Sequence, residues 1–440
     1  MAAEDGQKKN IVVIGGGIIG CTSAYFLSRH PSFDPSKHTI TLLEASKIAG
    51  GASGKAGGLL ALWAYPSSLV PLSYKLHKEL AQQHGGEERW GYRAVHCGSV
   101  DCKGRALNEL RGKGNKDLKV DGKDNEMHGE QNPKDAHVSL EKRKNNPKLA
   151  AAGVPKDLDW VHADCLRVYD EMGDPTTTAQ VHPFQFTTAM ADLAAEKGVD
   201  IKTQSPVESI NYTPDHSAVQ SVTYTDTATN ATRTLPATDV VLAAGPWTQS
   251  LYPSAPITSM RAHSVTIRPS RPVSAYALFT QIALPPNFSQ TPESTLSHKP
   301  LSSKNKHSQL VSPEIYARPK NEVYACGEGD RLIPLPATTS EVQVDEKRCQ
   351  DIVDYVSSIS DELAQGEVTA RQACYLPNVS VGSGSPLVGL TGVRGVVMAA
   401  GHTCWGIQNG PGTGKLVGEF VFEGKAESAK VQGLDPRRAL

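Results

Sequence analysis

Short apolar runs and helical apolar spacing alternate at the start of the chain. Residues 10–14 read Asn-Ile-Val-Val-Ile, and residues 39–44 form a second apolar run that ends in Glu44. Runs of this kind are typical of strands buried on both faces of a parallel sheet. Residues 18–29, between the two runs, space their apolar positions as a helix does. The pattern therefore predicts a strand–helix–strand unit, the smallest parallel βαβ arrangement.

Further along the chain, the same two patterns predict a mixture of helices and strands. Helices are expected over 181–198, with Phe184 and Phe186 among its apolar positions, over 345–363, and from about Gly414 to Glu423. Strands are expected over 199–201, 206–210, 239–244, 262–268, 314–326 and 395–400, and a hairpin pairs 219–224 with 232–235. The fold class is therefore α/β, mixed with α+β.

Two segments lack the apolar residues that a packed core requires. Residues 103–148 are rich in Lys, Asp, Glu, Asn and Gly, and residues 285–312 are rich in Pro, Ser and Lys. The first segment is predicted to be a partly disordered surface insertion, and the second a long loop. A solvated insertion without a role is the ordinary interpretation of 103–148, and a docking site for a protein partner is the alternative.

Composition narrows the class of protein. The 440 residues carry a net charge of −1, which gives no basic footprint for nucleic acid or for an acidic membrane surface. No apolar run approaches the roughly 20 residues of a membrane span. The eight cysteines form no Cys-x-x-Cys pair, and the first ten residues show no signal region. We expect a cytoplasmic protein with reduced thiols and without a metal site.

The first chemical motif is a glycine fingerprint between the first strand and helix. Gly15 permits a tight turn, Gly17 permits close approach of a pyrophosphate, and Gly20 permits the helix to pack on the sheet. The helix N-terminus then offers free N–H groups to the phosphates. Glu44 ends the next strand, where its carboxylate can accept hydrogen bonds from ribose hydroxyls. Together these residues predict a dinucleotide site.

A second glycine-rich segment, Gly50-Gly51-Ala52-Ser53-Gly54-Lys55-Ala56-Gly57-Gly58, follows Glu44. A nicotinamide enzyme has no need for such a loop, whereas a flavin enzyme must run its chain close to the pyrophosphate and the isoalloxazine ring. Ser53 can also donate a hydrogen bond to a phosphate. The loop therefore favours FAD over NAD, and an NAD-linked dehydrogenase is the weaker alternative.

Two later segments combine a buried strand with small residues. Residues 240–247 read Val-Val-Leu-Ala-Ala-Gly-Pro-Trp, and residues 396–415 run from Val-Val-Met-Ala-Ala through Gly401-His402 to Gly414-Lys415. A strand, a glycine turn and a helix start gather backbone N–H groups, which can stabilise negative charge on a reduced flavin. A Walker A phosphate loop is excluded, because residues 409 and 416 are Asn and Leu.

In order and spacing, these four segments resemble the glycine oxidase/D-amino-acid oxidase (DAO-type) family of FAD-dependent oxidoreductases over roughly residues 10–423. The forms GASGKAGG and GHTCWGIQNGPGTGK are most similar to a fungal oxidoreductase branch linked to endosome-to-Golgi transport. The resemblance implies a Rossmann-like FAD domain interleaved with an antiparallel-sheet substrate domain. The expected FAD domain comprises 10–65, 175–250 and 385–425. The expected substrate domain comprises 66–102, 149–174 and 251–384.

The resemblance also implies the chemistry and the cofactor contacts. Family members oxidise a C–N bond of a small amine or amino acid, with hydride transfer to flavin N5 and reoxidation by oxygen. Some relatives bind FAD covalently through a cysteine, but not in the turn that holds Cys404, so non-covalent FAD is expected. The expected cofactor-binding residues are Gly15, Gly17, Ile18, Ile19, Gly20, Glu44, Ala45, Ser46, Ala52, Ser53, Lys55, Ala56, Gly57, Gly58, Val207, Ala244, Gly245, Trp247, Gly401, Gly406, Ile407, Gly412 and Thr413.

Four residues are candidates for contact with the substrate. Arg318 lies close to a substrate-binding arginine of the family, and Arg371 is a second planar cation that could bind a carboxylate. His263 shares a predicted strand face with Arg261, from which it could line the flavin cavity. His402 lies in the glycine turn that faces the flavin in the family. The competing hypothesis is an FAD-bound protein of low turnover that acts in endosome-to-Golgi trafficking through the 103–148 insertion.

Overall fold

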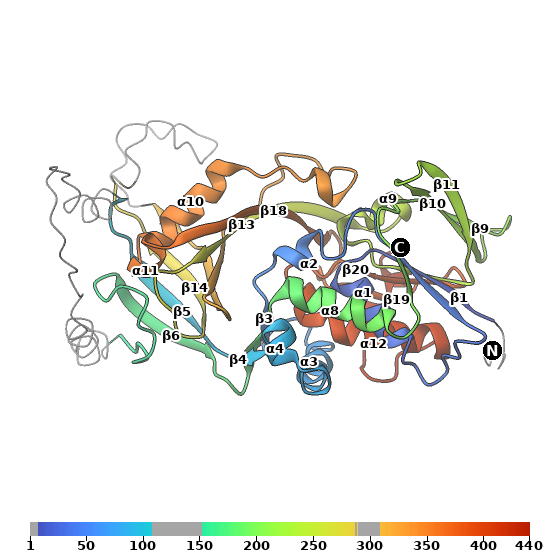
Figure 1. The fold of residues 1–440 in the computed structure, drawn as a ribbon, viewed down its shortest axis with the longest axis horizontal. Helices are drawn as coiled ribbons and strands as arrows, with labels where there is room; N and C mark the ends of the chain where they lie inside the picture. Colours follow the sequence, from blue (N-terminus) through green and yellow to red (C-terminus); the bar gives the residue numbers. More distant parts are fainter. Residues whose placement is uncertain (1–7, 108–151, 287, 289–308) are drawn as a thin grey trace, which may run out of the picture.

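A six-stranded, mostly parallel sheet forms the centre of one half of the molecule, as the computed structural model shows (Figure 1). The structure describes residues 8–107, 152–286, 288 and 309–440. From β20 to β8 the strands are parallel, and β19 is antiparallel to β20. In spatial order the strands are β19 (Leu387–Leu390), β20 (Val396–Ala400), β12 (Asp239–Leu242), β1 (Asn10–Ile14), β2 (Thr39–Leu43) and β8 (Asp200–Lys202).

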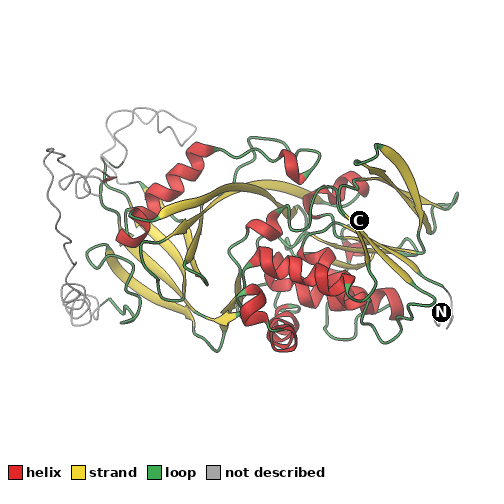
Figure 2. Cartoon of the chain, in the orientation of Figure 1, coloured by secondary structure: helices red, strands yellow, loops and turns green. Residues whose placement is uncertain are grey.

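Both faces of this sheet are covered, which explains the unbroken apolar runs in its strands. In β1, Ile11 and Val13 pack with the helical side, whereas Val12 and Ile14 pack on the opposite side. The helices of the first side are α1 (Ile18–Leu27), α8 (Pro183–Ala195) and α12 (Gly406–Glu423) (Figure 2). The opposite side is covered by the antiparallel strands β9 (Val207–Tyr212), β10 (Val219–Asp226) and β11 (Ala231–Pro236). The predicted hairpin corresponds to β10 and β11.

Helix α12 begins at Gly406, earlier than the expected start at about Gly414. The glycines of this segment serve close helix packing as well as the turn. A Cβ atom on Gly410 would lie 2.7 Å from Ile18 Cγ1, and one on Gly414 would lie 2.5 Å from the backbone carbon of Thr22. Helices α1 and α12 therefore approach each other along a seam that only glycine permits. The glycine-rich sequence from Gly406 to Gly414 predicted a loop, because it does not show that another helix packs against it.

The other half of the molecule is built on an eight-stranded, mostly antiparallel sheet. The expected strand over 314–326 is a hairpin of two strands, β16 (Glu314–Arg318) and β17 (Glu322–Cys326). The strand expected over 262–268 is longer and spans Ile257–Arg268. Short strand β15 (Leu310–Val311), inside the segment expected to be a loop, pairs with β14 (Tyr276–Ala283). The remaining strands, in spatial order, are β18 (Glu367–Val379), β13 (Ile257–Arg268), β17 (Glu322–Cys326), β16 (Glu314–Arg318), β14 (Tyr276–Ala283), β5 (His96–Lys103) and β6 (Leu166–Gly173).

Helix α10 (Glu346–Ser357) packs on this sheet and is followed by α11 (Asp361–Ala364), where one continuous helix was expected. The long strands β13 and β18 extend from this half toward the first one (Figure 1). A small sheet of β3 (Leu59–Ala61), β7 (Thr178–Gln180) and β4 (Arg93–Ala94) lies where the chain passes between the halves. Short helices α2 (Ala52–Lys55) and α9 (Thr248–Leu251) complete the connections.

Some expected boundaries differ from the observed packing. Helices α3 (Val70–His84) and α4 (Gly86–Trp90) were expected in the substrate domain, but Leu80, Ala81 and Trp90 belong to the core around α1 and α8. Phe184 was expected on the apolar face of the helix over 181–198, but its side chain is exposed. Apart from 103–107, the expected insertion 103–148 lies outside the described residues, as do 287 and 289–308.

In the described part of the chain, no helix is long and apolar enough to cross a membrane.

Candidate functional site

A cavity of about 750 Å³ lies between the two halves of the molecule. One side of the cavity is formed where β1, β2, β12 and β20 end. This is the edge where open parallel sheets bind ligands. The opposite side, which we call the upper wall, is formed by side chains of the eight-stranded sheet, from β13, β14, β16, β17 and β18. The cavity is therefore shared by both halves.

The three fingerprint glycines differ in the atoms that an added side chain would meet. Gly15 has φ of +111°, and a Cβ there would lie 2.4 Å from the carbonyl oxygen of Ala243. A Cβ on Gly20 would lie 1.9 Å from the carbonyl oxygen of Gly15. Gly17 meets only the Ser53 hydroxyl, at 3.1 Å, so its bare face is open to the cavity. Gly15 and Gly20 fix the turn, and Gly17 leaves room for a pyrophosphate.

Glu44 is held rigidly at the end of β2. One carboxylate oxygen accepts a hydrogen bond from the Gly16 N–H at 2.7 Å, and the other accepts one from the Ser46 N–H at 2.9 Å. The side chain is buried yet lines the cavity. Its remaining lone pairs suit the ribose hydroxyls that the sequence predicts as its partners. The residues present therefore fit a dinucleotide.

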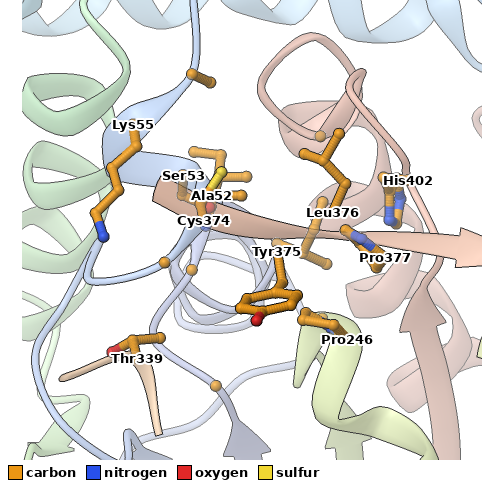
Figure 3. Close-up of a pocket in the computed structure, with 18 of the residues that line it drawn as sticks. Ala52, Ser53, Lys55, Pro246, Thr339, Cys374, Tyr375, Leu376, Pro377 and His402 are labelled. Atoms are coloured by element: carbon orange, nitrogen blue, oxygen red, sulfur yellow. Dashed lines mark hydrogen bonds between the residues drawn. The ribbon is translucent and has the colours of Figure 1, made fainter. Parts of the chain in front are cut away.

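The second glycine segment passes between the nucleotide side of the cavity and the eight-stranded sheet. A Cβ on Gly57 would lie 2.3 Å from the Tyr316 ring, so only glycine allows this contact. The Ser53 hydroxyl accepts a hydrogen bond from the Ile18 N–H at 2.8 Å, and Lys55 Nζ donates to the carbonyl of Ala373 at 2.8 Å. Figure 3 shows Ala52 and Ser53 beside the β18 residues that cross the pocket.

His402 lines the cavity from the turn after β20 (Figure 3). Its Nε2 and the Thr413 hydroxyl are 2.9 Å apart, and burial lowers the pKa of His402 to about 3. The imidazole is therefore neutral at neutral pH and carries no positive charge. Helix α12 begins just beyond, and its first residues, Gly406 and Ile407, also line the cavity.

The structure brings most of the predicted cofactor residues to this one cavity. Four of them lie outside its lining: Gly20, Ser46, Gly412 and Thr413. Gly412 instead packs against Ser73, whose hydroxyl accepts from the Gly412 N–H at 2.8 Å. Contacts with FAD remain predictions for the nineteen that line it: Gly15, Gly17, Ile18, Ile19, Glu44, Ala45, Ala52, Ser53, Lys55, Ala56, Gly57, Gly58, Val207, Ala244, Gly245, Trp247, Gly401, Gly406 and Ile407.

Arg318 is buried but does not line the cavity. Its guanidinium pairs with Glu322 at 2.8 Å and donates to the carbonyls of Ala56 and Gly57. The Arg318 guanidinium also lies 4.7 Å from the centre of the Tyr324 ring. The side chain thus ties β16 to the glycine segment, where the sequence suggested a contact with substrate.

Arg371 and His263 also lie away from the cavity lining. Arg371 donates to Gln350 at 2.5 Å and to the carbonyl of Glu346, between β18 and α10. His263 does share a face of β13 with Arg261, but that face looks away from the cavity, which Met260 and Ala262 line. The physical reason is the two-residue alternation of a strand.

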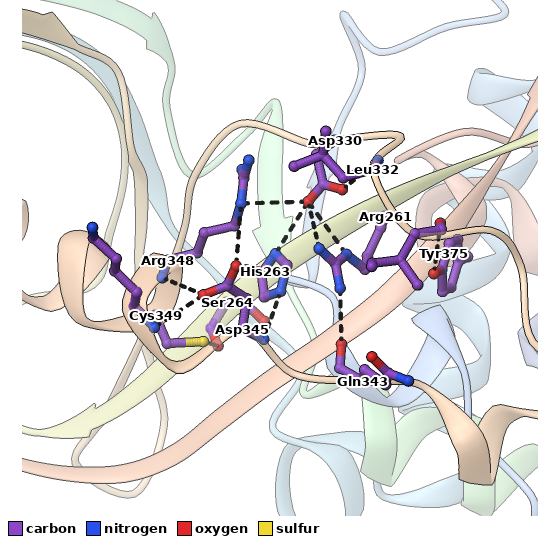
Figure 4. Close-up of polar contacts among 12 residues, drawn as sticks. Arg261, His263, Ser264, Asp330, Leu332, Gln343, Asp345, Arg348, Cys349 and Tyr375 are labelled. Carbon is purple, nitrogen blue, oxygen red and sulfur yellow. Dashed lines mark hydrogen bonds and ion pairs between the residues drawn. The ribbon is translucent and has the colours of Figure 1, made fainter. Parts of the chain in front are cut away.

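A buried ionic cluster occupies this other face of β13 (Figure 4). Arg261 pairs with Asp330 at 3.3 Å, and His263 Nδ1 lies 3.8 Å from the same carboxylate. His263 Nε2 accepts from the Asp345 N–H at 3.1 Å, and burial lowers the pKa of His263 to about 4. Arg348 is the second positively charged partner of Asp330, at 3.6 Å, because the His263 ring is neutral at neutral pH. The cluster is structural.

Several cavity residues were not predicted from the sequence. All of them except Trp405, which precedes α12, lie on the upper wall. They are mostly aromatic or sulfur-containing, with one acid among them: Met260, Phe279, Glu314, Tyr316, Tyr324, Cys326, Cys374 and Trp405. The alternation of side chains along a strand could have indicated some of them, because Glu314 and Tyr316 share a face of β16 with Arg318. Their convergence depends on strand pairing that no local pattern reveals.

At one sheet edge the structure combines a glycine cradle, a carboxylate fixed by backbone N–H groups and a second glycine segment. This combination is typical of dinucleotide-binding flavoproteins. Residues 10–420 match the DAO family, described as "FAD dependent oxidoreductase". The chain belongs to this family and is an FAD-dependent oxidoreductase.

Two fungal proteins are similar to the chain over nearly all of its length. TDA3 of Saccharomyces cerevisiae is 34% identical, over 98% of this chain and 94% of that protein. A protein of Schizosaccharomyces pombe is 32% identical over 99% of both chains. Both are named only as oxidoreductases, without a substrate.

Solved structures share the fold at low sequence identity. Glycine oxidase of Bacillus cereus has a TM-score of 0.63 at 18% identity, over 96% of both chains. L-proline dehydrogenase of P. horikoshii has a TM-score of 0.65 at 16% identity, over 98% of both. Iminodiacetate oxidase of Chelativorans has a TM-score of 0.63 at 16% identity, over 97% and 98%. At these identities the likeness concerns the fold.

Proposed function

We propose that this protein oxidises a C–N bond of a small amine or amino acid. The observation that carries the proposal is a single cavity that begins at the nucleotide cradle of Gly15 and Gly17 and continues to an aromatic wall on the other half of the molecule. The names of the structural neighbours, glycine oxidase, L-proline dehydrogenase and iminodiacetate oxidase, support the same bond type. Non-covalent FAD binding is part of the proposal.

FAD held by the glycine cradle and Glu44 would supply two-electron oxidation of the carbon next to nitrogen to a C=N bond, with oxygen as the final electron acceptor and hydrogen peroxide as its product. The nitrogen loses its proton to water, and hydrolysis of the C=N bond gives a carbonyl compound and an amine. The chain's own residues provide position and electrostatics. Helix α12 points its N-terminus, at Gly406 and Ile407, into the cavity, where the helix dipole stabilises negative charge. His402, held by Thr413, offers a neutral hydrogen-bonding ring.

Anaerobic flavin bleaching tests this proposal. Purified holoprotein is mixed with glycine, sarcosine, D- and L-amino acids, simple amines and polyamines, and flavin absorbance is followed before and after oxygen is admitted. At least one amine should bleach the flavin, and oxygen should restore it with release of peroxide. Bleaching without oxygen consumption would make the protein a dehydrogenase. A flavin that no amine or amino acid reduces would refute C–N oxidation.

A role in endosome-to-Golgi trafficking stays a prediction from the sequence. The insertion proposed to serve it lies almost wholly outside the described residues, and no described residue favours it. Deleting 108–148 separates the two functions, because amine turnover should survive this deletion if the cavity alone performs the chemistry.

A further inference from the structure

The charges on the cavity wall point to the kind of substrate that fits. Among the described lining residues, tyrosines and cysteines apart, the ionisable side chains are Glu44, Lys55, Glu314 and His402. Glu44 is bound by backbone N–H groups at the nucleotide end, and His402 is neutral. No arginine is among the lining residues, so the bidentate partner that suits a substrate carboxylate is absent from the described wall.

Glu314 is the acid of the upper wall, at the start of β16. Its Oε2 accepts a hydrogen bond from the Tyr316 hydroxyl and lies 3.8 Å from Cys326 Sγ. Within the described part of the chain, Glu314 has no ion-pair partner, and its Oε1 accepts no hydrogen bond from protein. Burial raises the pKa of Glu314. A half-buried carboxylate at a cavity wall without a cation is a costly arrangement that a positively charged ligand would relieve.

Aromatic side chains line the same cavity as this carboxylate. Tyr316 stacks on Tyr324 at 5.8 Å between ring centres, and Phe279 meets Tyr316 edge to face at 6.3 Å. Trp63 links Phe279, at 6.0 Å, to Trp405, at 5.5 Å. Aromatic faces attract ammonium groups, especially where water is excluded, and they tolerate N-methyl groups well. Acid and rings together form a site for an organic cation.

Lys55 is the one cationic side chain on the described wall, but it does not neutralise Glu314. Its Nζ donates to the carbonyl of Ala373, and no ion pair joins it to Glu314. Desolvation lowers the pKa of Lys55. An amino-acid substrate would have to place its carboxylate in a cavity that offers this single amine and an opposing acid. An amine without a carboxylate meets no such repulsion.

We propose that the substrate is an ammonium compound without a carboxylate, recognised by Glu314 and by the aromatic side chains of Phe279, Tyr316 and Trp405. The proposal rests on the proposed function in that it specifies which amines this same cavity would accept. It predicts that binding follows ligand charge, independently of turnover.

Ligand titration of the oxidised holoprotein tests the proposal without requiring catalysis. The probes are tetramethylammonium chloride, tert-butanol as an uncharged molecule of similar size, and sodium acetate as a carboxylate. Flavin difference absorbance and calorimetry report binding. We expect tetramethylammonium to bind about tenfold or more tightly than either other probe. Glu314→Gln should weaken tetramethylammonium binding about tenfold and leave tert-butanol unchanged.

Two further variants keep the test specific. Phe279→Leu should weaken tetramethylammonium binding several-fold, because it removes an aromatic face and keeps an apolar one. Glu367→Gln is the control, because Glu367 lies on the same sheet but is exposed and paired with Arg268. It should bind all three probes as the native protein does. Urea unfolding of each variant excludes a general loss of structure.

The outcomes separate this inference from the proposed function. If tetramethylammonium binds in a Glu314-dependent way and no amine reduces the flavin, the inference stands and C–N oxidation falls. If glycine reduces the flavin while acetate binds more tightly than tetramethylammonium, C–N oxidation stands and the inference is overturned. Unchanged tetramethylammonium affinity in Glu314→Gln would also overturn it.

Discussion

Gly17→Ala should separate FAD binding from folding. The backbone of Gly17, at φ −78° and ψ 179°, is open to any residue, and its added Cβ would meet only Ser53 Oγ, at 3.1 Å. The Ser53 side chain can shift slightly, so the free energy of unfolding of the apoprotein should change by less than about 1 kcal/mol. The methyl group would, however, occupy the face that a pyrophosphate must approach. Losing one charge-assisted hydrogen bond costs about 1.5–3 kcal/mol, or roughly 10- to 150-fold in Kd.

Fluorescence titration of apoprotein with FAD measures this loss, and urea unfolding of the apoprotein measures stability. Gly433→Ala is a matched control, since nothing lies within 4 Å of its added Cβ. Gly20→Ala is the contrasting variant. Its Cβ would lie 1.9 Å from the Gly15 carbonyl oxygen, so folding itself should suffer. An unchanged FAD affinity in Gly17→Ala would show that the phosphates do not pass this residue.

Two further predictions concern buried polar residues. Arg318→Met removes the ion pair with Glu322 and the hydrogen bonds to the glycine segment, so we expect a lower urea midpoint and faster FAD loss. A raised KM with unchanged stability would instead show that Arg318 contacts substrate. Burial lowers the pKa of His77 to about 4. The unfolded chain therefore binds the proton first, and stability falls as pH drops from about 7 to 4, by about 2 kcal/mol at pH 5. His77→Gln should flatten the dependence of the urea midpoint on pH between 8 and 5, and an equal slope in both proteins would contradict the assignment.

The nucleotide half of the cavity could be predicted from the sequence because its determinants are local. Gly15, Gly17 and Gly20 lie within one turn and one helix start, and Glu44 ends the next strand along the chain. These residues are close together in the sequence, and their order and spacing are sufficient to indicate the motif. The family match over residues 10–420 confirms the FAD-dependent class that these residues indicated.

Helix boundaries were harder to predict for a related reason. A glycine-rich run such as Gly406 to Gly414 has low helix propensity and ordinarily indicates a loop. Here the run is helical and packs directly against α1, where a side chain on Gly410 or Gly414 would collide with Ile18 or Thr22. Tertiary packing outweighs propensity at this seam, and the partner helix lies almost four hundred residues earlier in the chain.

The upper wall could not be predicted in this way, because its residues meet only through strand pairing and docking of the halves. Strand β16 illustrates the point. Its inner face carries Glu314, Tyr316 and Arg318, and attention to chemistry alone selects the arginine as the substrate contact. The hairpin places Glu322 opposite Arg318, which satisfies the cation and withdraws it from the cavity. Glu314, at the other end of the strand, meets no such partner and faces the cavity. The charged side chain that β16 presents to the cavity is therefore an acid, where the sequence suggested an arginine.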